Sequence, residues 1–370
     1  MLKMMKQGNF SVPDGQKPKK KTTWKKVLLI LLLSLLLLIV AAVAAVGLYM
    51  NYLLGRVTPY DPSEDVTISM EEAEQLVQED PEAVTLDPDS TEDVPDLEEL
   101  PTVPEEPTDP MDAVNWDNVI NIMLVGQDRR PGQGRQRSDT MILLTVNKST
   151  GTITLTSFMR DQYVRIPGYK NNKLNAAYAF GGVSLMNETL ETNFGVRVDG
   201  NVEVDFNSFQ KLIDRLGGVD IKLTKKEASY LSAVCGQDWS AGTHRLNGEQ
   251  ALVYARLREI DSDYNRAQRQ RNVISSLIRR YQELPVTEMI TMLEDVLPLV
   301  KTNMTKGQII DYAMEVAPIL PGANLETMRI PVDGTFRSGI ARVRAGLAAW
   351  FQYDIDFAAN REALRKIFAE

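Results

Sequence analysis

Two apolar runs with a short polar turn between them constrain the fold of this chain more than any other feature. The runs cover residues 141–146 and 153–158, and the turn is Asn-Lys-Ser-Thr-Gly. This pattern predicts a β-hairpin. Because antiparallel strands return to the same edge of a sheet, Asp139 at the start of the first strand should lie near Arg160 after the second. The sequence therefore predicts a charged site at one sheet edge.

Strand and helix patterns alternate around this hairpin. Buried strands are predicted over residues 119–125, 202–206 and 219–223, with helical spacing of apolar residues between them. The alternation favours an α/β fold in which a mixed central β-sheet is flanked by helices. Residues 285–370 carry no comparable motif, and we expect a helical C-terminal extension of the domain with one late strand near residues 326–331.

The N-terminal segment has the charge pattern of a membrane anchor. Residues 27–50 contain no charged side chain, and a helix of about 20 apolar residues spans a bilayer. Lysines are concentrated before this run, so the positive-inside rule places the basic tail, residues 1–26, in the cytosol and the rest outside. We expect a single-pass protein of the cell membrane. A cleaved signal peptide is the alternative, because residues 42–44 resemble a cleavage site, although the apolar run exceeds the usual length of about 7–15 residues.

Acidic residues are concentrated directly after the expected anchor. Residues 57–113 contain twenty Asp and Glu and no Lys or Arg, in a stretch rich in Pro and poor in aromatic residues. Such a composition does not favour a packed core. We therefore expect residues 51–115 to be an extracellular linker and residues 116–284 to be the main folded domain. The net charge of −9 comes from this linker and does not describe the ligand.

Two residue types that serve many catalytic sites are nearly missing. Cys235 is the only cysteine and His244 the only histidine. This excludes a histidine-rich zinc site and makes a Ser-His-Asp mechanism depend on a single histidine in a loop-like segment. We expect His244 to be a surface or packing residue. The chemistry then has to come from carboxylates, arginines and a hard metal ion.

Two aspartates lie at the ends of neighbouring strands. Asp128 follows the strand over residues 119–125, and Asp139 opens the next strand after a Gly-rich loop. Paired carboxylates at strand ends suit Mg²⁺ (or Mn²⁺), since Mg²⁺ prefers oxygen ligands. The alternative is that each carboxylate caps a strand or pairs with a nearby arginine such as Arg137.

Basic side chains accumulate around the hairpin and near a helix predicted over residues 263–284. Guanidinium groups match phosphate geometry and are less costly to desolvate than ammonium groups, so several converging arginines indicate a pyrophosphate or another polyanion. A solvated charged helix face is the alternative, and a location outside the membrane argues against nucleic acid as a partner. The candidates are Arg137, Arg160, Arg165, Lys173, Arg256, Arg258, Arg266, Arg269 and Gln270.

Five short motifs occur in a fixed order in the same region. They are RSDT from Arg137, RD..V.IPG from Arg160, K.NAAYAFGG from Lys173, LNGEQAL.YAR.R from Leu246 and R..RQ from Arg266. As a set, and together with the basic tail and the membrane anchor, they make the chain resemble the LytR-CpsA-Psr family of cell-wall enzymes over residues 119–284. The sequence departs from the family pattern at Gln127, where Ser is frequent, and at Met159, where Pro is frequent.

The resemblance implies an activity. Members transfer a glycopolymer, such as a teichoic acid or a capsular chain, from an undecaprenyl-pyrophosphate carrier to peptidoglycan. The family fold has an apolar cleft for the prenyl chain and a basic mouth for the pyrophosphate. A lipid pyrophosphatase and a non-catalytic polyprenyl-phosphate-binding envelope regulator remain alternatives.

The resemblance also implies roles for individual residues. Asp128 and Asp139 would hold Mg²⁺, and the basic candidates with Gln270 would bind the pyrophosphate. Asp139, Arg160 and Arg137 would be catalytic. We expect Asp139 or Asp161 to accept the proton of the attacking sugar hydroxyl.

Overall fold

The computed structural model describes most of the chain after the expected anchor. The described residues are 44–45, 47–78, 83–86, 94–101, 103, 111–127, 137–285, 288 and 294–369. Most of the expected anchor lies outside them, and residues 47–52 are helical. In the described part of the chain, no helix has the length and apolar character needed to cross a membrane. Residues 1–52 form one unit and residues 53–370 a second, which is described below.

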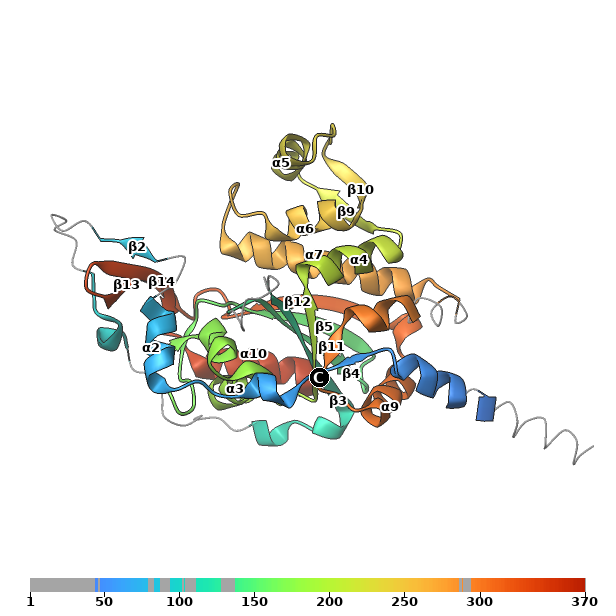
Figure 1. The fold of residues 1–370 in the computed structure, drawn as a ribbon, viewed down its shortest axis with the longest axis horizontal. Coiled ribbons are helices and arrows are strands. Elements are labelled where there is room, and N and C mark those ends of the chain that lie inside the picture. The colour runs from blue at the N-terminus through green and yellow to red at the C-terminus, as the bar shows by residue number, and fades with distance from the viewer. Residues whose placement is uncertain are drawn as a thin grey trace, which may run out of the picture. The chain divides into compact units, whose positions relative to one another are not determined.

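A mixed seven-stranded sheet forms the centre of the second unit (Figure 1). Strands β3, β4 and β5 pair antiparallel, whereas β8 joins β3 and β12 joins β5 in parallel. The predicted hairpin and mixed α/β fold are therefore confirmed. The strand order is β1 (Thr58–Pro59), β11 (Lys301–Thr302), β8 (Gly200–Asp205), β3 (Val119–Gln127), β4 (Ser138–Asn147), β5 (Thr152–Phe158) and β12 (Asn324–Ile330).

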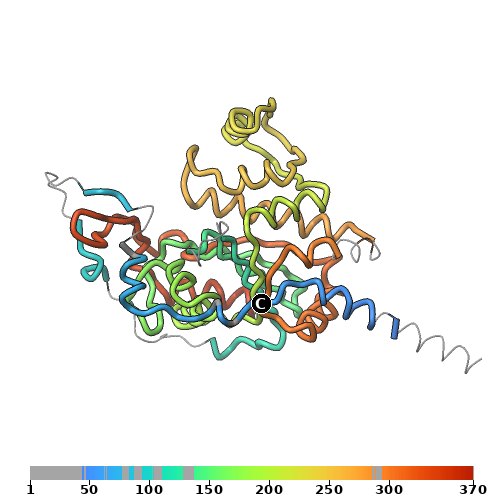
Figure 2. The backbone as a smooth tube through the Cα atoms, viewed as in Figure 1, coloured from blue at the N-terminus to red at the C-terminus, as the bar shows by residue number. Residues whose placement is uncertain are grey.

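Helices cover both faces of this sheet. Helices α3 (Leu174–Phe194) and α10 (Phe357–Ala369) contribute to the core on one face, and α7 (Asp263–Gln282) and α9 (Lys306–Val316) to the core on the other. Successive side chains of a strand point to opposite faces, so Leu143 of β4 joins the first core and its neighbour Leu144 the second. Figure 2 shows α10, at the end of the chain, lying below the sheet beside segments from the first half.

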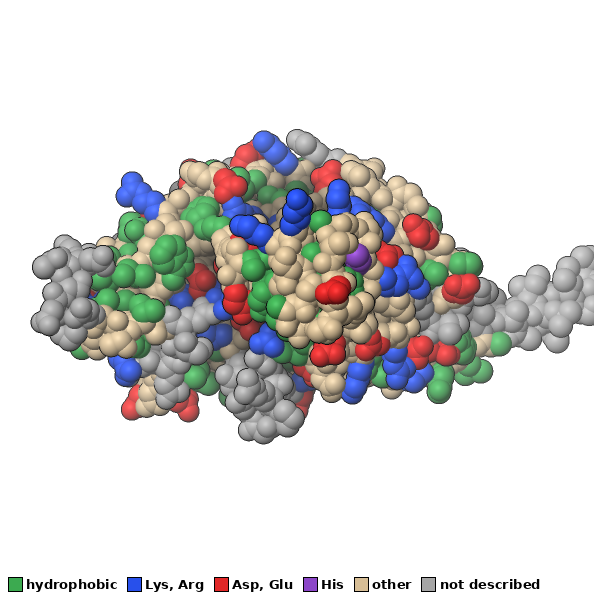
Figure 3. Space-filling view, turned by 90° about the horizontal axis from the view of Figure 1, so that it is seen from above, with side chains coloured by type: hydrophobic (Ala, Val, Ile, Leu, Met, Phe, Trp, Pro, Cys, Tyr) green, Lys and Arg blue, Asp and Glu red, His purple; other side chains and the backbone are tan. Residues whose placement is uncertain are grey.

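A smaller layer lies beyond α7, with α5 farthest from the sheet (Figure 1). It has its own apolar core, to which Ile221 and Leu223 contribute, while Lys222 between them is exposed. Seen from the α5 side, this face carries Lys, Arg, Asp and Glu side chains (Figure 3). The layer consists of α4 (Phe206–Arg215), β9 (Val219–Leu223), α5 (Lys225–Cys235), β10 (Gly242–Leu246) and α6 (Gly248–Arg256).

Helix α3 is bent where two glycines follow each other. Gly181 and Gly182 have non-helical backbone angles, and Gly182 has φ 67° and ψ −154°. Glycine adopts this conformation without steric strain, whereas other residues do not. A Cβ added to Gly181 would lie only 2.5 Å from the Cβ of Leu185. The two glycines therefore interrupt the helical backbone, and the helix continues beyond them as a second segment.

Part of the expected linker belongs to the fold, which corrects the prediction for residues 51–115. Strand β1 pairs with β11 at the sheet edge. Helix α2 (Met70–Gln78) places Ala73 in the main core, where Tyr60 and Met111 are also buried. A few apolar residues spread through an acidic segment do not form a core by themselves. They are buried here because the rest of the domain supplies the other side of the contact.

Residues 285–370 are more than a helical extension, which corrects a second prediction. The expected late strand is confirmed as β12, but it belongs to the central sheet, and Phe357 and Leu364 of α10 lie in the main core. Strands β13 (Arg337–Arg344) and β14 (Leu347–Tyr353) form an additional hairpin. Parallel pairing joins segments that are distant in sequence, so the local pattern does not reveal it.

Candidate functional site

The charged edge predicted from the hairpin is present. Because β4 and β5 are antiparallel, the start of β4 and the end of β5 meet at one edge. Arg160, directly after β5, donates from Nη1 to Oδ1 of Asp139 at 3.2 Å. Arg160 is 9% exposed, so its charge is held in a largely buried position by a carboxylate from the neighbouring strand.

Helix α7 and the segment before it add further charges. Arg266 Nη2 lies 2.6 Å from Oδ1 of Asp263, and Arg160 Nε lies 3.9 Å from Oδ2 of the same residue. Arg258 Nη2 lies 3.6 Å from Oδ1 of Asp139. Three guanidinium groups from three parts of the chain thus converge on two carboxylates. We call Asp139, Arg160, Arg258, Asp263 and Arg266 the Asp139 cluster.

A small cavity opens at the Asp139 cluster. Asp139, Arg160, Asp263 and Arg266 line it together with Gln270, which lies one turn after Arg266 on the same side of α7. Guanidinium and amide N–H groups that face one space are suited to binding the oxygens of an anion. The geometry therefore agrees with a site for a phosphate or pyrophosphate group.

Asp161 is held by a buried lysine and by strand β14. Lys173 is 2% exposed, and its Nζ lies 3.1 Å from Oδ1 of Asp161 and 5.2 Å from the ring centroid of Phe351. The backbone N–H of Gln352 donates to the carbonyl oxygen of Asp161 at 2.8 Å. These contacts fix the segment that carries Arg160. Lys173 thus holds the segment next to Arg160 in place through Asp161. Strand β14, from the C-terminal region, fixes the backbone of the same segment.

Arg137 and Arg256 contact other parts of the domain. Arg137 donates from Nη2 to the carbonyl oxygen of Leu76 in α2 at 3.1 Å. The guanidinium carbon of Arg256 lies 4.4 Å from the ring centroid of Phe206, a cation–π distance. These contacts tie α2 to the start of β4 and the end of α6 to the start of α4.

Arg165 and Asp128 are the candidates for which the structure gives the least support. Arg165 follows strand β6 (Tyr163–Val164), and its backbone N–H donates to Oδ1 of Asn193 at 3.0 Å. That contact attaches the segment to α3. Asp128 lies outside the described residues.

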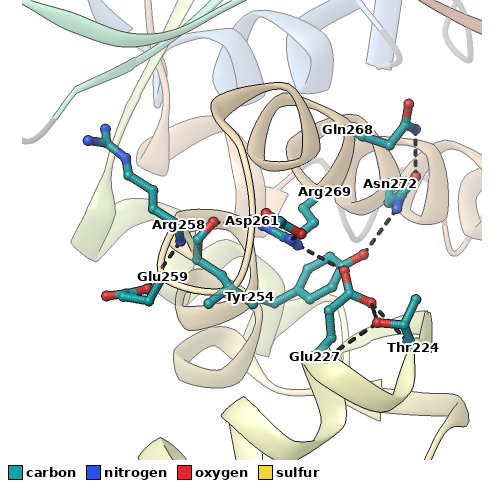
Figure 4. A network of polar contacts seen from close by, with 10 residues as sticks. Thr224, Glu227, Tyr254, Arg258, Glu259, Asp261, Gln268, Arg269 and Asn272 are labelled. Carbon is teal, nitrogen blue, oxygen red and sulfur yellow. Dashed lines mark hydrogen bonds and ion pairs between the residues drawn. The ribbon is translucent and has the colours of Figure 1, made fainter.

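Arg269 does not join the Asp139 cluster. It is 1% exposed, donates from Nε to Oε1 of Glu227 at 2.8 Å and from Nη1 to the carbonyl oxygen of Leu257 at 2.6 Å, and pairs through Nη2 with Asp261 (Figure 4). Its guanidinium group thus connects α5, the segment after α6, and α7. This differs from the expected role in binding pyrophosphate, because three protein groups already use its N–H donors.

Two charged residues of α7 were not singled out from the sequence. Asp263 in the first turn of α7 resembles a residue that only stabilises a helix N-terminus, and its contact with Arg160 is not visible in the sequence. Arg271 is buried, and this burial, with the charge of Arg329 as a smaller cause, lowers its pKa to about 10. The run of Arg and Gln residues in α7 does not reveal which of them face inward.

His244 and Cys235 lie away from the Asp139 cluster, in β10 and α5. The His244 Nε2 is 2.8 Å from the carbonyl oxygen of Ser240, and the ring packs edge-on against Trp239. The expected packing role of His244 is therefore confirmed.

Asp139 has the features of a metal ligand. Both of its ion pairs use Oδ1, which leaves Oδ2 for a further ligand, and its side chain is 32% exposed. Strand β3 ends at Gln127, which pairs with Ser138, the residue before Asp139. Within the described ranges there is no group of three or more His, Cys, Asp or Glu residues that could hold a metal. One carboxylate fits a cation, and the participation of Asp128 stays a prediction.

Sequence and structure comparisons relate the chain to one group of proteins. The LytR_cpsA_psr family model matches residues 96–352. The polyisoprenyl-teichoic acid–peptidoglycan teichoic acid transferase TagU of Bacillus anthracis is 31% identical over 252 residues, which cover 67% of this chain and 78% of that protein. Biofilm regulatory protein A of Streptococcus mutans is 32% identical over 245 residues, or 59% of this chain and 58% of that protein. The structure of TagT bound to LIIa-WTA has a TM-score of 0.54 at 26% identity, covering 74% of this chain and 97% of TagT.

Proposed function

The chain belongs to the LytR_cpsA_psr family, and on this premise we propose that it transfers a glycopolymer from an undecaprenyl-pyrophosphate carrier to peptidoglycan. The observation that carries the proposal is the Asp139 cluster, where three arginines converge on two carboxylates beside a cavity. The relatives support the same class of reaction, since TagU is named a teichoic acid–peptidoglycan transferase and TagT is bound to LIIa-WTA.

The arginines would act on the pyrophosphate group of the donor. Phosphoryl transfer requires mainly positioning of the reactants and positive charge where negative charge develops. Arg160 and Arg266 are 9% and 4% exposed, and Asp139 and Asp263 already hold their guanidinium groups in place. Their donors would therefore be oriented before the substrate arrives. Arg258 is exposed and would close the site from the segment before α7.

Asp139 is the better of the two candidates for accepting the proton of the attacking hydroxyl. Its side chain is 32% exposed, compared with 11% for Asp161. Oδ1 of Asp161 is also engaged by buried Lys173, which leaves this carboxylate less accessible to an incoming hydroxyl. Asp161 would then serve to position Arg160, whose Nε lies 3.6 Å from its Oδ2.

Asp139 and Asp128 would hold a divalent cation, Mg²⁺ or Mn²⁺. When bound, the cation would supply positive charge to the leaving phosphate. The partly exposed carboxylate of Asp139 supports this assignment, and Asp128 directly follows β3 in the sequence.

We also propose a location at the cell membrane, with residues 27–50 as the anchor and residues 1–26 in the cytosol. The uncharged run and the lysines that precede it support this orientation. The Asp139 cluster would then lie outside the membrane, on the side that carries peptidoglycan.

Replacing Asp139 by Asn tests the reaction. The substitution keeps the shape of the side chain and removes its charge, so lipid-pyrophosphate binding, which depends on the arginines, should change little. The rate constant for transfer to peptidoglycan fragments should fall by about 100-fold, since the lost interaction acts mostly in the transition state. Treating the wild type with EDTA should give a similar loss. Asp238→Asn, which changes an exposed aspartate outside the cluster, is the matched control.

Four results would contradict parts of the proposal. If Asp139→Asn transfers polymer at the wild-type rate, the carboxylate is only a structural partner of the arginines. If EDTA has no effect, the reaction does not use a divalent cation. Release of free polymer with water as the acceptor would identify a pyrophosphatase. Lipid binding without turnover under all conditions would identify a non-catalytic binder, an alternative that the likeness to Biofilm regulatory protein A keeps relevant.

A further inference from the structure

A second cavity lies on the other side of α7 from the Asp139 cluster. Its volume is about 590 Å³, and Asn265 and Asn272 of α7 line it, whereas Asp263 and Gln270 line the first cavity. At 100° per residue the two pairs point to opposite sides of the helix. An α-helix with its side chains is about 10–12 Å across, so one extended ligand can reach both cavities.

The wall of the second cavity is made rigid by buried ion pairs. Arg269 bridges Glu227 and Asp261, and Asn272 donates from Nδ2 to the hydroxyl of Tyr254 at 3.0 Å (Figure 4). Burial raises the pKa of Glu227, but hydrogen bonds from Thr224 and Arg269 outweigh it and leave the pKa below its usual value. Because the charges in the wall are paired, the wall presents mainly amide and hydroxyl groups to a ligand.

The rim of the same cavity is basic. Lys222, Lys225 and Lys226 line it, and all three are exposed. Lys222 points outward because its neighbours on β9, Ile221 and Leu223, are buried in the small core. Several cations beside one concave surface attract an anion before it is bound.

We propose that this cavity binds the sugar chain of an anionic glycan and is a subsite of the transfer reaction. The amides of Asn265 and Gln268 would bond to sugar hydroxyls, and the lysines would pair with phosphate or carboxylate groups along the chain. The inference rests on the proposed function in one respect, namely that a chain bound here has one end at the Asp139 cluster.

The segment between α6 and α7 connects the two sites. Arg258 at its start contacts Asp139, and Ile260 and Asp261 farther along line the second cavity. A glycan that follows this segment would pass from the pyrophosphate to the basic rim. Two ligands are anionic glycans of this kind. One is the phosphate-containing polymer of the donor, and the other is the carboxylate-containing peptidoglycan acceptor.

Binding of short glycans to the full chain in detergent tests the proposal. The probes are a synthetic poly(glycerol phosphate) hexamer, a disaccharide-pentapeptide from peptidoglycan and a neutral chitin hexamer, each titrated by calorimetry. The wild type should bind at least one anionic probe more tightly than the neutral one. The double variant Lys222→Glu/Lys226→Glu should weaken that binding by about tenfold, as expected for reversing two exposed charges. Lys211→Glu, on the exposed side of α4, is the matched control.

The outcomes separate the two sources and the two proposals. Tighter binding of the hexamer identifies the donor polymer, and tighter binding of the muropeptide identifies the acceptor. No binding of either by the wild type, or equal binding by wild type and double variant, overturns the subsite. Asp139→Asn should bind the probes with the same affinity as the wild type. The binding test of the subsite is therefore independent of whether the proposed transfer reaction is correct. Melting curves of each variant exclude loss of fold as the cause.

Discussion

Arg160 is the residue on which the charges of the site converge. It lies within 3.2–3.9 Å of Asp139, Asp161 and Asp263, which come from β4, the segment after β5 and α7. A guanidinium group with partners on several sides has little freedom to turn, so a phosphate meets donors that are already oriented. The same arrangement makes the residue sensitive to substitution, because its removal takes one positive partner away from each of three carboxylates.

Arg160→Ala should reduce transfer far more than Arg279→Ala. The first substitution removes a charged hydrogen-bonding partner at the proposed mouth, which corresponds to about 1.5–3 kcal/mol, or roughly 10- to 150-fold in rate. Arg279 is exposed in the last turn of α7, and its replacement should leave the transfer rate unchanged. Steady-state transfer and lipid-pyrophosphate binding are measured for both. Equal losses of transfer in the two variants would mean that Arg160 is not part of the pyrophosphate site.

Single residues differ in how well the sequence predicts their surroundings. The Asp139–Arg160 contact follows from a hairpin, in which local order fixes which strand ends meet. The partners of Arg269 do not follow in this way, because Glu227 comes from a separate helix that packs against α7. Helical spacing shows which residues share a stripe, but not which segment covers that stripe.

At the scale of elements, α7 separates two environments. One side carries Asp263, Arg266 and Gln270 toward the Asp139 cluster, and the other carries Arg269 toward α5. The sequence predicts the existence and length of this helix well, since its apolar residues have clear helical periodicity. The sequence does not predict that α5 is attached to it through a buried ion pair.

Glu227→Gln should weaken the attachment of α5 in a pH-dependent way. The pKa of Glu227 in the folded protein lies below its ordinary value of 4.5. Its contribution is therefore complete above pH 4.5 and is lost as the pH falls further, through the folded pKa. At pH 7 the variant should lose about 1.5–3 kcal/mol, as for the loss of a hydrogen bond to a charged group, because Arg269 keeps Asp261 as a partner. The gap between wild type and variant should narrow as the pH falls from 5 to 3.

Denaturant unfolding at a series of pH values checks this expectation. Glu249→Gln, an exposed position in the first turn of α6, is the control and should show no such trend. A constant difference between wild type and Glu227→Gln across the acidic range would mean that the carboxylate charge is not what holds α5.

At the scale of the whole molecule, segments from both ends of the second unit complete the sheet and its cores. β1 and β11 extend one edge of the sheet, and β12 forms the other. The central strands and helices were predictable because their patterns are local. The two-residue edge strands β1 and β11 were not, since runs this short carry no periodicity. Strand β12 was expected as a strand, but its place in the central sheet was not, because parallel pairing leaves no trace in the intervening sequence. The composition of residues 57–113 also led to a wrong prediction, that of a solvated linker. Composition is an average over the segment and does not show the few side chains that are buried.

The packing of α2 separates a folded segment from a solvated linker. Ala73 is 4% exposed and lies in the main core, whereas Glu71 on the same helix is exposed. Ala73→Asp places a carboxylate in an apolar environment, which costs several kcal/mol. Since about 1 kcal/mol corresponds to 2–4 °C in a domain of this size, the melting temperature should fall by roughly 5–10 °C. Glu71→Ala should leave it unchanged. If both variants melt with the wild type, α2 does not contribute to the core, and residues 51–115 are the spacer that their composition indicates.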